Sequence, residues 1–188
     1  MGNCGNSPRQ RKLDVVEHMM PLYYLRDAPI TAEDSHAVRS SWNKIVQNDV
    51  SNYLLNCKRG TVIHDQCLSW FYAIFYERLF YVHPLAQQWF KNEIFAQGRL
   101  LLQLMSVLNL VFVRGDKFTL NLLGLQTTFT NMNVSLYEVG IIGDVLFYSL
   151  NFCLDEEYTP VSAAWVKIYS EFLYTISKQY SSMDRRRS

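Results

Sequence analysis

Histidine and cysteine are the residues of this chain that most readily bind metals or act as nucleophiles. The four histidines all precede residue 84: His18, His36, His64 and His83. The four cysteines are spaced too widely to form a CxxC pair: Cys4, Cys57, Cys67 and Cys153. No Ser/His/Asp, Cys/His or paired-carboxylate arrangement stands out either. We therefore expect no metal site and no enzymatic activity of a conventional hydrolase.

The N-terminus carries the residues of an acylation site. Gly2 can accept a myristoyl chain on its α-amino group once Met1 is removed, although the consensus prefers Ser or Thr where this chain has Asn6. One myristoyl chain binds membranes weakly, with a constant of about 10⁴ M⁻¹, and Cys4 offers a second site for palmitate. The alternative is a tail in which Gly2 and Cys4 carry no lipid.

Basic residues follow at Arg9, Arg11 and Lys12, and they add attraction to anionic lipid. This start has no apolar core, so it does not resemble a secretory signal. The most apolar stretch, residues 100–113, is shorter than the ~20 residues needed to cross a bilayer. We therefore expect the cytoplasmic face of a membrane, or otherwise the cytoplasm, as the location. Cysteines there are mostly reduced, with a Cys57–Cys67 disulfide as the alternative.

Length and charge limit the remaining classes. The chain has 188 residues, 49% of them hydrophobic, and a formal net charge of +1, which gives no electrostatic case for a nucleic-acid partner. We divide it into an N-terminal tail (1–30), one domain (31–180) and a basic C-terminal tail (181–188).

The hydrophobic pattern from residue 34 onward is helical almost throughout. Thr31 and Asp34 form a predicted capping box, and residues 48–65 are predicted to be a loop or a short irregular helix. Thr127 to Asn133 is rich in residues that compete with helix, so we place a short helix before it, at 118–126. Thr159 and Pro160 are predicted to be the N-cap and first residue of the last helix.

Apolar stripes at helical spacing define the expected core. Their members are Val38, Trp42, Ile45 and Val46; Leu68, Phe71, Tyr72, Phe75 and Leu79; Leu101, Leu104, Met105, Leu108 and Phe112; Ile142, Val145, Leu146, Ser149, Leu150 and Cys153; and Trp165, Ile168, Phe172 and Ile176. No segment alternates with the period of a strand. The sequence predicts an all-α fold.

The order of several motifs resembles that of globins, nearest the neuroglobin and globin X branches. These motifs are Thr31-Ala32-Glu33 with Ser41-Trp42; residues 75–80 followed by Pro84 and Phe90; Leu123-Gly124 as the start of the proximal helix; and Gly143-Asp144 through Leu150, Cys153-Leu154, Tyr158-Thr159-Pro160, Ala163-Ala164-Trp165 and Tyr169. The resemblance implies a globin-like multi-helix sandwich over residues 31–180. It also implies N-terminal acylation, as in the globin X branch.

The same resemblance implies haem, but the chain departs from the family at the residue that holds it. Globins bind haem iron through an imidazole on the proximal helix, where this chain has Thr127 or Phe129, depending on the register. Gln97 falls at the distal position. Together with Phe90 and Leu101, these residues mark the expected site of a former haem pocket. We expect no cofactor.

The alternative is haem b held by another ligand. Met132 lies near the proximal turn, and His64 could fold back from the segment between the first two helices, residues 48–65. Two functions follow. The first is a haem-free, membrane-tethered sensor or interaction module whose cleft is filled by side chains or holds an apolar ligand or a protein partner. The second is a haem globin that binds oxygen or takes part in redox signalling.

Overall fold

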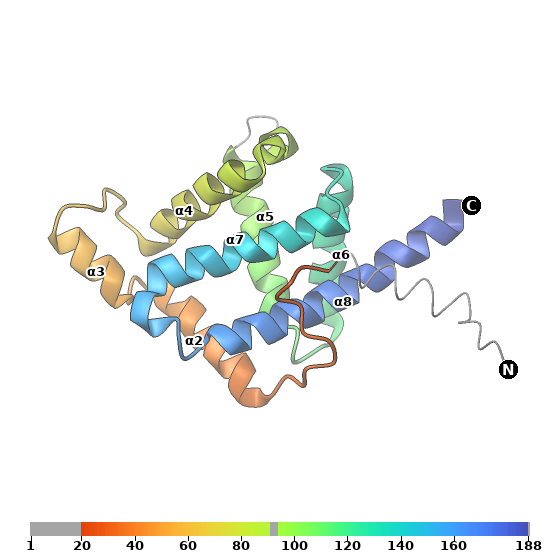
Figure 1. The fold of residues 1–188 in the computed structure, drawn as a ribbon, viewed down its shortest axis with the longest axis horizontal. Coiled ribbons are helices and arrows are strands. Elements are labelled where there is room, and N and C mark those ends of the chain that lie inside the picture. The colour runs from red at the N-terminus through yellow and green to blue at the C-terminus, as the bar shows by residue number, and fades with distance from the viewer. Residues whose placement is uncertain (1–19, 91–93, 188) are drawn as a thin grey trace, which may run out of the picture.

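Every regular element of the described chain is a helix. The computed structural model describes residues 20–90 and 94–187, and describes side chains for 20–90 and 96–178. No strand occurs in these ranges, so the prediction of an all-α fold is confirmed (Figure 1). The elements in chain order are α2 (Ala32–Val46), α3 (Ser51–Lys58), α4 (Cys67–Val82), the 3-10 helix η1 (Pro84–Phe90), α5 (Ile94–Leu108), α6 (Asp116–Asn131), α7 (Leu136–Leu154), the 3-10 helix η2 (Asp155–Glu157) and α8 (Ser162–Arg187).

Reciprocal side-chain caps start two of these helices. Thr31 caps α2 as predicted: its hydroxyl accepts from the Asp34 backbone N–H, and the Asp34 carboxylate accepts from the Thr31 backbone N–H. Ser135 and Glu138 form the same box at the start of α7. Each box satisfies backbone N–H groups that a helix N-terminus leaves without partners.

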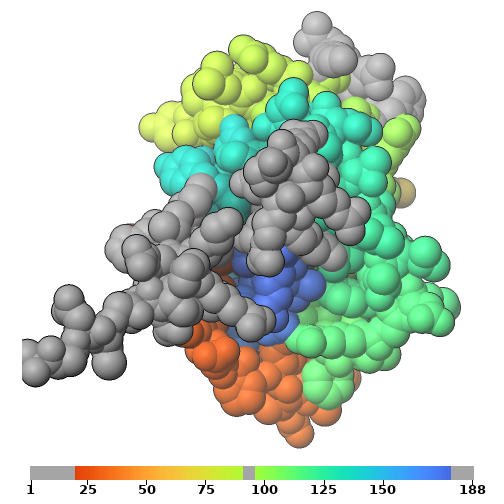
Figure 2. Space-filling model, turned by 90° about the vertical axis from the view of Figure 1, so that its right-hand side faces the viewer, coloured from red at the N-terminus to blue at the C-terminus, as the bar shows by residue number. Residues whose placement is uncertain are grey.

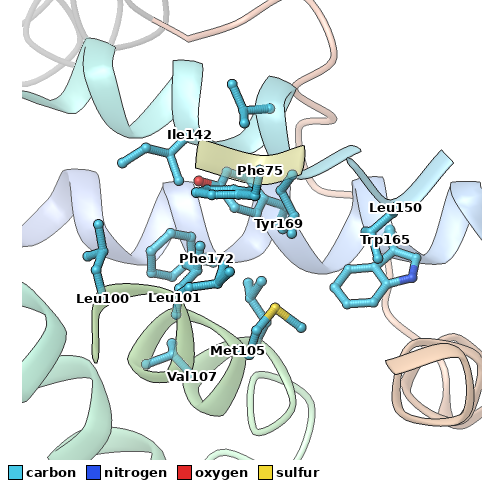
Figure 3. Close-up of a cluster of buried hydrophobic side chains, with 14 of the residues drawn as sticks. Phe75, Leu100, Leu101, Met105, Val107, Ile142, Leu150, Trp165, Tyr169 and Phe172 are labelled. Carbon is cyan, nitrogen blue, oxygen red and sulfur yellow. The ribbon is translucent and has the colours of Figure 1, made fainter. Parts of the chain in front are cut away.

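A single core joins these helices. The most extensive contacts between helices are those of α4 with α7, α5 with α6, α2 with α8 and α7 with α8. Figure 2 shows the blue α8 against the orange α2. Leu101 and Met105 project from α5 toward Phe172 and Tyr169 of α8, as Figure 3 shows. All members of the five predicted stripes are buried or partly buried in this core except Val46 and Phe112, which are exposed.

Helix α6 corrects two sequence predictions. It runs unbroken from Asp116 to Asn131, through the threonines that were expected to end it. The hydroxyls of Thr127 and Thr130 each donate to the carbonyl four residues earlier, so their hydrogen bonds lie within the helix and do not end it. Leu123 and Gly124 consequently lie inside the helix, and do not start it.

Two other boundaries differ from expectation. The segment 48–65 contains a regular helix, α3, which packs against α7. The last helix begins at Ser162, not at Pro160, because residues 159–161 form turns in which the Val161 backbone N–H donates to Tyr158. The Ser162 hydroxyl donates to the Thr159 carbonyl, which holds this turn against the helix.

Residues 20–30 belong to the packed body, although we placed them in the N-terminal tail. The Tyr23 ring lies edge-on to Phe147 and Tyr169, and its hydroxyl donates to the Gly140 carbonyl at 2.8 Å. The Leu25 backbone N–H donates to the Ser170 hydroxyl. At the other end, the helical backbone of α8 continues into the expected C-terminal tail, to Arg187.

Candidate functional site

The apolar residues expected to face haem lie inside the core. Phe90 is 2% exposed, and Leu101 and Phe129 are fully buried. Phe90 packs edge-on against Tyr76 and Phe80. The space around these three side chains is therefore filled by the protein itself.

The donor set at the expected proximal position does not fit haem. Thr127 is exposed, and its hydroxyl donates to the Leu123 carbonyl of its own helix. Phe129 has no lone pair to offer, and no histidine occurs anywhere from residue 84 to 188. Haem iron in globins needs an imidazole at this place. The chain supplies none there.

The two alternative axial ligands lie at the end of α6 and in the segment before α4. Met132 is the C-terminal cap of α6 and is partly buried against the core. His64 precedes α4, and its backbone carbonyl accepts from the Tyr53 hydroxyl at 2.9 Å. Neither residue lines the groove described next.

A groove of about 780 Å³ lies between α4, α5 and α6. Its lining residues recur at helical spacing on each wall: Tyr72, Ala73 and Tyr76 from α4; Gln97, Gly98, Arg99, Leu102, Gln103 and Ser106 from α5; and Leu120, Asn121 and Gly124 from α6. The volume falls within the range of about 300–1,000 Å³ that is typical of small-molecule sites. Of the five residues predicted to mark a pocket, Gln97 alone lines this groove.

Two glycines keep the groove open. A Cβ added at Gly98 or Gly124 would meet no atom within 4 Å. Glycine inside a helix lowers its stability by up to about 1 kcal/mol relative to alanine. A side chain at either position is therefore compatible with the helical backbone, and it would extend into the open groove.

The α4 wall of the groove carries two tyrosines in different states. The Tyr76 hydroxyl donates to the Gln97 backbone carbonyl. The Tyr72 hydroxyl is buried and has no hydrogen-bond partner among the described residues. Burial raises the pKa of the Tyr72 phenol above its ordinary value, so the group stays protonated at neutral pH and can donate.

The α5 wall of the groove supplies further hydrogen-bond donors. The Thr128 hydroxyl donates to the Gln103 carboxamide oxygen at 2.9 Å, which leaves the Gln103 amide N–H groups as donors. Arg99 is the only charged residue among the described residues of the lining, and it is exposed at the rim. These hydrogen-bond donors suit a ligand that accepts hydrogen bonds and carries a negative charge.

Sequence patterns alone did not reveal this groove. From the sequence, we placed Tyr72 in a core stripe and made no prediction for Arg99 or Gln103. The one available signal was a glycine within each of two helical segments, at Gly98 and Gly124.

The described cysteines are free thiols, as expected, and no disulfide joins Cys57 to Cys67. Burial and the nearby Cys57 raise the pKa of Cys67 to about 12, and burial also raises the pKa of Cys153. Thiolates are the reactive form, so these two buried thiols are poor nucleophiles.

The predicted lipidation residues, Gly2 and Cys4, lie outside the described residues. One described segment, Leu136–Glu157, is long and apolar enough to cross a membrane by length and composition. More than half of its most apolar window (56%) is buried inside the fold, as in the core helix of a soluble protein.

Within residues 20–90 and 94–187, no three His, Cys, Asp or Glu side chains gather into a possible metal site. No protein-family model, curated protein or solved structure matches the chain.

Proposed function

We propose that this chain is a globin-like helical module that works without haem, held at the cytoplasmic face of a membrane by N-terminal acylation. It acts as a sensor or interaction protein. The observation that carries the proposal is the packing of Phe90, Leu101 and Phe129, all at most 2% exposed, at the positions where the family resemblance places haem.

The energetics of that packing oppose haem binding. Burial of each large apolar side chain stabilises the fold by about 1.5–3 kcal/mol. A porphyrin entering at these positions would displace three of them. With Thr127 or Phe129 in place of an imidazole, no iron–nitrogen bond offsets that cost.

The colour of the purified protein tests this part of the proposal. Protein produced with a haem precursor in the medium should be colourless. An intense Soret band at one haem per chain, lost in Met132→Ala or in His64→Ala, would favour the alternative haem globin and would identify the ligand.

Gly2 and Cys4 support the tether. Two acyl chains hold a protein at a membrane because each buried CH₂ contributes about 0.8 kcal/mol. In a eukaryotic cell, Gly2→Ala should release the protein to the cytosol, since palmitate on Cys4 needs the first chain to bring it to the membrane. Cys4→Ser should leave a weakly bound form that salt releases further, because the basic residues act through screened attraction.

Intact mass and membrane fractionation measure these outcomes. The parent protein should carry a myristoyl group on Gly2 and sediment with membranes. An unmodified Gly2, or a Gly2→Ala variant that fractionates like the parent, would refute the tether.

A further inference from the structure

The groove between α4, α5 and α6 has the features of a binding site and no occupant within the described chain. Its wall residues Leu102 and Leu120 are exposed apolar side chains, at 51% and 68%. Exposed leucines on two facing helices gain stability when a ligand covers them, in proportion to the area removed from water.

The polar groups of the groove indicate the charge of that ligand. Gln103 follows Arg99 by four residues on α5, so the two side chains share one face of the helix, and the Gln103 amide N–H groups can donate. Arg99 supplies a positive charge, and no carboxylate is among the described lining residues. A carboxylate suits both donors, because its two oxygens can accept from an amide and from a guanidinium.

We propose that this groove binds a long-chain carboxylate, such as a fatty acid, with its carboxylate at Arg99 and Gln103 and its alkyl chain along Leu102 and Leu120. The inference rests on the proposed haem-free function, since it names the ligand class of the same module. It concerns a groove whose lining excludes the buried positions Phe90, Leu101 and Phe129.

Fluorescence titration with cis-parinaric acid, an 18-carbon fatty acid, tests this site. The full chain is produced in bacteria, where Gly2 receives no lipid, and its melting curve confirms that each variant folds. The parent should bind one parinarate per chain. Gly124→Leu should abolish binding by filling the groove, whereas Thr130→Leu, an exposed position on the same helix outside the lining, should leave binding unchanged.

Two further variants test the carboxylate contacts. Gln103→Met, which keeps the length of the side chain, should weaken parinarate binding about tenfold or more, as loss of a hydrogen bond to a charged group does. Arg99→Gln should weaken it by about two- to fivefold, because the exposed guanidinium is screened by water. Parinaric acid methyl ester, which has no charge, should bind the parent more weakly and should be insensitive to Arg99→Gln.

Several results would overturn the inference. These are the absence of saturable binding by the parent, equal affinity in Gly124→Leu, or equal affinity of acid and ester. If Gly124→Leu does not fold, Gly98→Leu takes its place, since its side chain enters the same groove. The absorbance spectrum of the same preparation separates the two claims: a Soret band on addition of haem contradicts the proposed function, whereas a parinarate failure without one contradicts only this inference.

Discussion

The Trp165 indole is fully buried, and its Nε1–H donates to the Ser41 hydroxyl at 3.1 Å. Ser41 in turn donates to the carbonyls of Ala37 and Val38, so one short chain of hydrogen bonds joins α8 to α2. The sequence predicted that Trp165 would be buried, from its place in an apolar stripe. It could not predict Ser41 as a partner 124 positions earlier, because a serine within a helix shows no sign of a distant contact.

Trp165→Ala should lower the free energy of unfolding by about 3–5 kcal/mol, through lost burial and the cavity left behind. Urea denaturation measures this change. A loss below about 1 kcal/mol, the size of an exposed-site effect, would contradict the packing described for Trp165.

Gly143 of α7 is a position where a single methyl group should destabilise the protein. A Cβ there would overlap the Tyr23 hydroxyl and the Tyr169 ring, and Tyr169 is fully buried. Gly143→Ala should therefore cost about 1–3 kcal/mol, because overpacking outweighs the gain in helix propensity. The matched control is Gly124→Ala on α6, which meets open space and should stabilise by up to about 1 kcal/mol. Equal melting shifts in both variants would contradict the packing of Tyr23 and Tyr169 against Gly143.

At the scale of elements, a side-chain hydrogen bond joins the end of α4 to the start of α7. His83 Nε2 lies 2.9 Å from Glu138 Oε1, and Glu138 also completes the capping box with Ser135. Burial alone would raise the pKa of Glu138. Hydrogen bonds from the Ser135 backbone N–H and hydroxyl, together with His83, outweigh that effect and leave the pKa below its ordinary value.

A depressed carboxyl pKa stabilises the fold above the pKa of the unfolded chain, and that contribution disappears as pH falls through the folded value. Glu138→Gln should therefore destabilise at about pH 7 by about 1 kcal/mol, and the difference from the parent should shrink from about pH 4.5 downward. Glutamine can still form the capping box, so the charge is what changes. Urea denaturation across this range measures the effect, with the exposed Glu77→Gln on α4 as control. A difference independent of pH would contradict the role of the pair.

Local sequence patterns predicted which segments are helical more accurately than they predicted the residues at which the helices end. The stripe on α7 was right at every position, because its core face has few interruptions. Helix α6 was cut short, since its threonines signal a helix end locally, whereas burial of Leu125 and Phe129 extends the helix. Tertiary packing, which no local window contains, decided that boundary.

At the scale of the molecule, the features that the sequence did not predict depend on contacts between segments far apart in the chain. Residues 20–30 precede the first helical stripe, so the sequence places them in a tail. Contacts with distant residues, such as those of Tyr23 with Gly140 and Gly143, place them on the body. The groove likewise forms only where α4, α5 and α6 pack together, so no single segment of the sequence predicts it. The all-α class was predictable because it depends on local periodicity.

Titration of the purified chain with haemin, followed at the Soret band, tests the central claim most directly. Because ligands that bind the native state raise its melting temperature, the same samples report binding a second way. A protein whose expected pocket is filled by Phe90, Leu101 and Phe129, and whose proximal position offers Thr127, should show no sharpened Soret band and no rise in melting temperature at one equivalent. A Soret band that saturates at one haem per chain, with a raised melting temperature, would contradict the claim that the protein works without haem.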